Sequence, residues 1–212
     1  MQIVSTPVGD ARYAVVASTS PSATLVLGHG AGGGIDARDL SALARQLPAR
    51  GITVVRVEQP WRVAGRKVAG PPPTLDKAWL AVLDAVRAAP ELGGQPLVAG
   101  GRSAGARVAC RTATAVGAVG VLALAFPLHP PGRPERSRAD ELLGAGVPTL
   151  VIQGSRDSFG APEEFPSGGT HKVVEIPEAD HSLAVRKGAS LTPAEITELV
   201  VRSAADWILA LV

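Results

Sequence analysis

The sequence contains a single cysteine, Cys110, and few aromatic residues, which account for 3% of its 212 positions. One cysteine cannot form an intrachain disulfide, a CxxC zinc site or a redox pair, and we interpret Cys110 as a packing residue. Because unpaired bases stack on aromatic rings, the scarcity of such rings argues against binding of single-stranded nucleic acid. A chain that cannot form an internal disulfide suits a reducing compartment, and we expect a cytoplasmic protein.

Long apolar runs and blocks of like charge are also missing. The N-terminal segment has no basic stretch followed by an apolar one, and no segment approaches the roughly 18 apolar residues of a membrane span. Lys and Arg are spread along the chain, and the formal net charge is +2. We therefore expect a soluble protein that is not exported and that binds neither a membrane nor a nucleic acid.

Apolar residues, in contrast, are abundant: they make up 46% of the chain, against 19% charged residues. This balance is typical of globular domains. A chain of 212 residues has the size of many α/β domains and can bury a large core. We interpret residues 1–212 as a single domain with an interior filled mainly by Ala, Val and Leu. The sequence carries no signal for an oligomeric state.

Short apolar runs alternate with helix-forming segments along the chain. Residues 2–8 and 12–18 flank Gly9-Asp10, a hairpin signal that predicts an antiparallel edge. Further strands are predicted at 23–27, 52–57, 97–100, 119–125, 149–153 and 171–176. A first helix is predicted to begin at a cap formed by Asp36 and to end at Pro48, and further helices are predicted at 75–88, 104–115, about 135–144 and 193–211. The proline-rich stretches 69–73 and 126–132 are interpreted as rigid loops. The alternation predicts a mostly parallel sheet covered on both faces, which is a three-layer α/β sandwich.

The clearest motif is GxSxG, formed by Gly101-Arg102-Ser103-Ala104-Gly105. It directly follows an apolar run and precedes a helix-forming segment, which is the context that a nucleophile elbow requires. In such a turn the serine has a strained backbone, and glycines are needed two positions away on either side. Two glycines around a serine can match by chance in a chain with 24 glycines. The strand before and the helix after favour Ser103 as a catalytic nucleophile.

A serine hydroxyl is a weak nucleophile, so it needs a base to accept its proton and an acid to orient that base. Asp157 follows the predicted strand 149–153, and His181 follows the predicted strand 171–176. Taken alone, the aspartate could be a turn former and the histidine a solvated loop residue. Their order after Ser103 and their positions past strand ends favour catalytic roles. Asp180 competes for the acid role, but a direct neighbour of His181 is poorly placed to bond its ring.

The tetrahedral intermediate of such a reaction carries an oxyanion, which backbone N–H groups stabilise well. We expect one N–H from Ala104, the residue after the nucleophile. The other is expected from the turn His29-Gly30-Ala31-Gly32, from Ala31. His29 is interpreted as a structural hydrogen-bonding residue beneath that turn.

No metal or cofactor is expected. The glycine-rich turn could also be a phosphate-binding loop, but neither GxGxxG nor GxxxxGK[ST] is present. The four histidines, at positions 29, 129, 171 and 181, show neither HxH nor HExxH spacing.

Several segments together resemble a known family. They are HGAGG from residue 29, GGRSAGAR from residue 100, FPLHPPGRPE from residue 126, QGSRDSFG from residue 153 and EADHS from residue 178. The sequence resembles the small α/β-hydrolase-like family that includes testis-expressed protein thirty and the third subunit of the non-specific-lethal histone acetyltransferase complex. More distantly it is similar to the dienelactone hydrolases, whose nucleophile is a cysteine where this chain has Ser103. The resemblance implies an α/β-hydrolase fold and triad roles for Ser103, Asp157 and His181, but no substrate.

The segment 126–148 is too short for the helical cap that many α/β-hydrolases insert there, so we expect an open, minimal site. The favoured function is a serine hydrolase that cleaves an ester or thioester of a small acyl substrate through an acyl-enzyme. A non-catalytic interaction module on the same fold is the main alternative, and a peptidase is a third, less favoured because no length is left for a substrate-selecting domain. Six basic residues could line the rim and favour acidic acyl groups, or could simply be solvated: Arg62, Arg66, Lys67, Arg102, Arg133 and Arg136.

Overall fold

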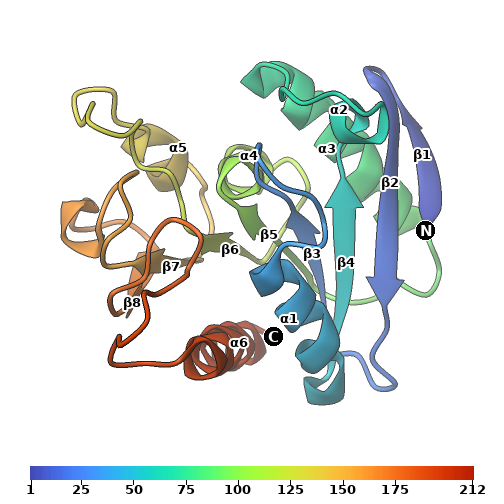
Figure 1. Cartoon of the computed structure of the whole chain (residues 1–212). Coiled ribbons are helices and arrows are strands. Elements are labelled where there is room, and N and C mark those ends of the chain that lie inside the picture. Colours follow the sequence, from blue (N-terminus) through green and yellow to red (C-terminus); the bar gives the residue numbers. More distant parts are fainter.

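Eight strands form one sheet in a computed structural model that describes residues 1–212 (Figure 1). Their spatial order is β1-β2-β4-β3-β5-β6-β7-β8. The strands are β1 (Gln2–Thr6), β2 (Gly9–Val16), β3 (Ala23–Gly28), β4 (Ile52–Glu58), β5 (Leu97–Arg102), β6 (Gly120–Leu124), β7 (Thr149–Gly154) and β8 (His171–Ile176). The predicted hairpin is confirmed, because β1 pairs antiparallel with β2, which in turn pairs antiparallel with β4. Its turn, however, lies at Pro7-Val8 and not at Gly9-Asp10, which are the first residues of β2. The other pairings are parallel.

Helices cover both faces of the sheet, which confirms the predicted three-layer arrangement (Figure 1). They are α1 (Arg38–Gln46), α2 (Pro60–Val63), α3 (Pro72–Ala88), α4 (Ala104–Thr112), α5 (Ala139–Leu143) and α6 (Pro193–Leu209), with short 3₁₀ turns at Leu47–Arg50 and Pro162–Glu164. None of these helices has both the length and the apolar character required to cross a membrane.

Alternate residues of each central strand supply two separate apolar clusters. In β3, Val26 packs in the cluster formed with α3 and α4, whereas Leu25 and Leu27 pack in the cluster formed with α1 and α6. This follows from the twofold alternation of side chains along a strand. All six residues of β3 are buried, which explains its continuous apolar sequence.

Several predicted boundaries were wrong. Asp36 lies outside α1 and does not cap it, and its exposed carboxylate lies 3.8 Å from Arg56. Helix α3 begins at Pro72 rather than at residue 75, so part of the predicted loop 69–73 is helical. Proline is tolerated in a first helical turn, because the N–H that it lacks has no partner there. Helix α2 was missed. Helix α4 ends at Thr112 rather than at residue 115, and α5 begins at Ala139 rather than near residue 135.

No cap domain covers the carboxyl edge of the sheet. Between β6 and β7 the chain forms a loop and the five-residue helix α5. The segments that follow β3, β5, β7 and β8 therefore meet at an open edge, which is where parallel-sheet proteins place functional residues.

Candidate active site

Ser103 lies between the end of β5 and the first residue of α4, with φ of 53° and ψ of −111°. A positive φ is unfavourable for a residue with a Cβ and costs on the order of 1–3 kcal/mol. Hydrogen bonds hold this turn: Ser103 N–H donates to the Leu124 carbonyl at 2.9 Å, and Arg107 N–H donates to the Ser103 carbonyl at 3.2 Å. The surrounding strand and helix thus maintain the strain that the GxSxG sequence predicted.

Gly101 and Gly105 allow this turn to pack against the end of β3. A Cβ added to Gly101 would lie 2.6 Å from the Gly28 carbonyl oxygen, and one added to Gly105 would lie 2.4 Å from the same atom. Real Cβ atoms do not approach so closely, so no side chain fits at either position. This agrees with the expectation that only glycine is tolerated two residues before and after the serine.

Three side chains that are distant in sequence meet at this edge. His181 Nε2 lies 3.0 Å from Ser103 Oγ, and His181 Nδ1 lies 2.8 Å from Asp157 Oδ2. The Asp157 side chain is fully buried, while His181 is about one fifth exposed. Asp180 does not contact the imidazole: its Oδ1 accepts the N–H groups of Ser182 and Ala184 and closes the loop. The structure therefore brings together the three residues that the sequence singled out.

Two further residues, which the sequence reasoning missed, support the carboxylate and the ring. Gln153 Nε2 donates to Asp157 Oδ2 at 2.9 Å, and the Phe159 N–H donates to Asp157 Oδ1 at 2.8 Å. The Phe159 ring stacks on His181 with a centroid distance of 4.2 Å. A signal was available for Gln153, because it is a polar residue at the end of the apolar run Leu150–Ile152.

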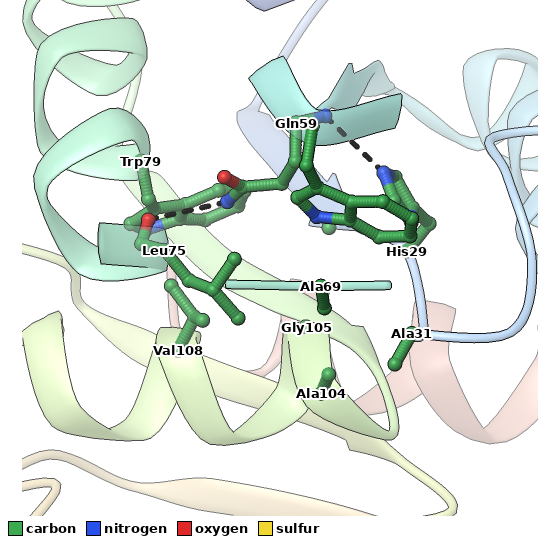
Figure 2. Close-up of a pocket in the computed structure, with 11 residues that line it drawn as sticks. His29, Ala31, Gln59, Ala69, Leu75, Trp79, Ala104, Gly105 and Val108 are labelled. Carbon is green, nitrogen blue, oxygen red and sulfur yellow. Dashed lines mark hydrogen bonds between the residues drawn. The ribbon is translucent and has the colours of Figure 1, made fainter. Parts of the chain in front are cut away.

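The turn after β3 and the start of α4 line one recess, shown in Figure 2. Ala31 and Ala104, the two residues expected to supply oxyanion donors, lie at the same end of it. The Ala31 N–H makes no hydrogen bond. Ala104 is the first residue of α4, so its N–H has no partner within the helix. Both donors are therefore available to an oxygen atom bound there.

The recess has mostly apolar walls. Trp61, Leu75, Trp79 and Val108 line it together with Gln59 and His29. In Figure 2, Leu75 and Val108 lie at the end away from Ala31. The recess is narrow, with room for about one water molecule, so only a small apolar group can bury its surface there.

His29 supports this recess from the turn. Its Nε2 accepts the Gln59 N–H at 3.2 Å, its Nδ1 lies 2.9 Å from the Gly30 carbonyl oxygen, and its ring packs against Trp61. One nitrogen must accept while the other donates, so the ring is neutral in this arrangement. Burial lowers the pKa of His29, which favours the same neutral form. His29 is thus a structural hydrogen-bonding residue, as predicted.

The six basic residues considered for the rim fall into two groups. Arg102 is not free to meet a substrate, because its Nε lies 2.9 Å from Asp39 Oδ2 and its Nη2 donates to the His181 carbonyl oxygen. The rim interpretation is therefore wrong for Arg102. The remaining five are exposed and form no ion pair: Arg62, Arg66, Lys67, Arg133 and Arg136.

Potential metal ligands are not gathered anywhere in the chain, since no three His, Cys, Asp or Glu side chains cluster as a metal site would need.

Cys110, inside α4, is buried, and burial raises the pKa of its thiol to about 12. A thiol with so high a pKa is a poor nucleophile near neutral pH.

The chain matches one family model and is similar to several solved structures. Residues 21–209 match the family model described as an alpha/beta hydrolase domain. The chain is similar to XC6422 from Xanthomonas campestris, described as an α/β serine hydrolase without a lid, with 23% identity, a TM-score of 0.71, and 97% of this chain and 93% of that chain covered. It is also similar to a dienelactone hydrolase from Anabaena variabilis, with 17% identity, a TM-score of 0.76 and coverage of 99% and 95%. A third similar structure is Est1E from Butyrivibrio proteoclasticus with ferulic acid bound, with 15% identity, a TM-score of 0.73 and coverage of 99% and 100%.

Proposed function

The chain belongs to the alpha/beta hydrolase domain family, and from this premise we propose that it is a serine hydrolase that cleaves a carboxylic ester or thioester of a small acyl group. The observation that carries the proposal is the line of contacts from Ser103 Oγ to His181 Nε2, at 3.0 Å, and from His181 Nδ1 to Asp157 Oδ2, at 2.8 Å. A nucleophile, a base and an orienting acid are joined in the order that acyl transfer requires.

In the proposed mechanism, His181 Nε2 takes the proton of Ser103 as Oγ forms a bond to the substrate carbonyl carbon. The buried carboxylate of Asp157 holds the ring in the tautomer with Nδ1–H and stabilises the imidazolium that forms. Collapse of the tetrahedral intermediate breaks the bond to the leaving alkoxide or thiolate, which receives the proton from His181. A water molecule, deprotonated by the same nitrogen, then attacks the acyl carbon. The bond from that carbon to Ser103 Oγ breaks, Oγ takes the proton back from His181, and the carboxylic acid leaves.

We also propose that the strained turn that carries Ser103 is a nucleophile elbow. We propose that the N–H groups of Ala31 and Ala104 bind the oxygen that becomes negatively charged in the tetrahedral intermediate. Removal of one such donor typically costs a factor of about 10² to 10³ in kcat. Because both donors belong to the backbone of rigid turns, they need no reorganisation as the charge develops.

The recess supports a small acyl group as the part of the substrate that is buried. It begins at Ala31 and Ala104 and ends against Leu75 and Val108 (Figure 2). With no cap domain above the sheet edge, the leaving group would remain in contact with solvent. Such a site distinguishes acyl groups better than it distinguishes leaving groups.

A fluorophosphonate probe tests the proposal, because it reacts far faster with a serine activated by a base than with an ordinary serine. We expect covalent labelling of the wild-type protein and of Ser182→Ala, in which an exposed serine beside His181 is removed, but no labelling of Ser103→Ala. Hydrolysis of p-nitrophenyl acetate should follow the same pattern. Absence of labelling and of hydrolysis in the wild type would overturn the proposal and would favour a non-catalytic interaction module.

We further propose that residues 1–212 form one domain, since both apolar clusters pack on the same eight-stranded sheet. The closer relationship to testis-expressed protein thirty and to the third subunit of the non-specific-lethal complex stays a prediction that rests on the segments quoted above.

A further inference from the structure

Arg102 connects three parts of the site that the sequence keeps far apart. It directly precedes Ser103, and its side chain is 15% exposed. Its Nη2 donates to the carbonyl oxygen of His181 at 2.6 Å, and its Nε lies 2.9 Å from Asp39 Oδ2. Its Nη1 lies near the glycine-rich turn, where a Cβ on Gly30 would be 3.7 Å away. The guanidinium therefore contacts the loop of the proposed base and approaches the turn of a proposed oxyanion donor.

Asp39 fixes the other side of this guanidinium. It lies in the first turn of α1 and is buried, and its Oδ1 accepts the N–H of Leu40 at 2.9 Å. Burial raises the pKa of Asp39, and the adjacent Arg102 opposes that rise. A buried carboxylate needs a partner of opposite charge, so Asp39 and Arg102 hold each other in place.

The loop that carries His181 depends on such anchors, because it contains no helix or strand. Leu183 in this loop has a φ of 50°, a strained conformation for a residue other than glycine. Two carbonyl groups of the loop accept hydrogen bonds from arginines: that of His181 from Arg102, and that of Leu183 from Arg38 at 3.0 Å. Of these two arginines, Arg102 is the one next to the nucleophile in the chain.

We propose that Arg102 is a positioning residue for the base: held by Asp39, it fixes the His181 backbone so that Nε2 remains within reach of Ser103 Oγ. This inference rests on the proposed function. The hydrogen bond from Arg102 to the His181 carbonyl links the backbone of the base to the residue that precedes the nucleophile. The planar guanidinium suits this role, because its Nε can face the Asp39 carboxylate in an ion pair while its Nη2 donates to the His181 carbonyl. A lysine offers a single ammonium, which pairs with Asp39 at the expense of the His181 carbonyl.

The substitution Arg102→Lys tests this role. It keeps a positive charge beside Asp39 and removes the hydrogen bond to the His181 carbonyl. We expect kcat for p-nitrophenyl acetate and the rate constant of fluorophosphonate labelling to fall roughly 10- to 100-fold, the scale expected when a reacting group is displaced by about 1 Å. KM should change less than about twofold, because no substrate contact is lost. The control is Arg186→Met, which removes an exposed charge from the same loop and should leave both rates unchanged.

A second variant separates positioning from folding. Arg102→Met alone would leave the charge of Asp39 buried without a partner of opposite charge. This substitution is therefore combined with Asp39→Asn in a double variant. We expect the double variant to keep a thermal midpoint close to that of Arg102→Lys but to remain slow. Proton NMR provides a readout without substrate: the low-field resonance of the His181 Nδ1–H bonded to Asp157 should broaden or shift in both variants and stay unchanged in Arg186→Met.

Failure of the proposed role of Arg102 can be distinguished from failure of the proposed function. Arg102→Lys and the double variant with wild-type kcat, labelling rate and imidazole resonance would show that Arg102 has only a structural role. If the wild type itself is neither labelled nor active, the proposed function fails, and the resonance alone then decides whether Arg102 fixes the imidazole.

Discussion

Gln153 donates a hydrogen bond to Asp157 through the same carboxylate oxygen, Oδ2, that contacts His181 Nδ1, at distances of 2.9 and 2.8 Å. The amide nitrogen also lies 2.7 Å from the Gly160 carbonyl oxygen and 3.3 Å from that of Phe126. Three acceptors around one nitrogen fix the orientation of the amide. The carboxylate is thereby held in place by a side chain from the preceding strand.

Replacement of Gln153 by Met should therefore impair both stability and catalysis. Buried carbonyl and carboxylate oxygens lose their donor, which costs about 1–3 kcal/mol in the free energy of unfolding. We expect kcat to fall about 10-fold or more, because Asp157 can then rotate away from the ring. Urea unfolding and ester hydrolysis measure the two effects. The control is Gln46→Met at an exposed position of α1, which should change neither.

Asp157→Asn should lower kcat by a factor of about 10⁴, because an amide can stabilise the wrong tautomer of His181 and cannot stabilise its imidazolium. Asp180→Asn should be mild, since an asparagine Oδ1 can still accept the N–H groups of Ser182 and Ala184. Steady-state hydrolysis of one ester by both variants gives the comparison. Equal losses in the two variants would mean that the acid has been assigned to the wrong aspartate.

Elements with a strong local signal could be predicted from the sequence. The continuous apolar run of β3 determined a strand that the structure contains. The Gly9-Asp10 signal predicted the hairpin of β1 and β2, but its turn lies two residues earlier, at Pro7-Val8. The order Ser103, Asp157, His181 sufficed to select three side chains that meet, because strand ends of a parallel sheet share one edge.

Features that depend on tertiary contacts or on very short segments were not predictable. Helix α2 has four residues, too few for a periodic pattern. The prolines at the start of α3 read as loop residues, although they fit a first helical turn. Arg102 looked like a surface charge because its partner Asp39 lies on a distant helix, and no local pattern reports such a pair.

Gly105→Ala should destabilise the protein by about 3 kcal/mol or more and slow the labelling of Ser103. The added methyl would lie 2.4 Å from the Gly28 carbonyl oxygen, so the backbone of β3 or α4 must move. Either movement displaces the turns that carry Ala31 and Ala104. Gly32→Ala is the matched control, because nothing lies within 4 Å of the added Cβ, and its stability should stay within about 0.5 kcal/mol. Thermal unfolding and probe labelling together test both variants.

Cys110 should resist iodoacetamide at pH 8 in the folded protein and react once the protein is unfolded in urea. Burial raises the pKa of its thiol to about 12, against about 8.5 in an unfolded chain. The folded state therefore holds the proton more tightly, and this group makes stability decline as pH rises from about 8.5 towards 12. Mass spectrometry of the alkylated protein is the measurement. Rapid modification of the native thiol, or loss of ester hydrolysis in Cys110→Ser at unchanged stability, would contradict this assignment.

The end wall of the recess should set the length of the acyl group. Leu75 and Val108 lie opposite the end formed by Ala31 and Ala104 (Figure 2). Leu75→Ala removes part of that wall, so kcat/KM should rise for p-nitrophenyl propionate relative to the acetate, by about 10-fold or more, because one added methylene is worth roughly 1–3 kcal/mol. Leu80→Ala, also in α3 but outside the recess, should leave the ratio unchanged. Because both variants shorten a leucine of the same helix, an equal shift in both would mean that helix destabilisation, and not the recess, governs the preference.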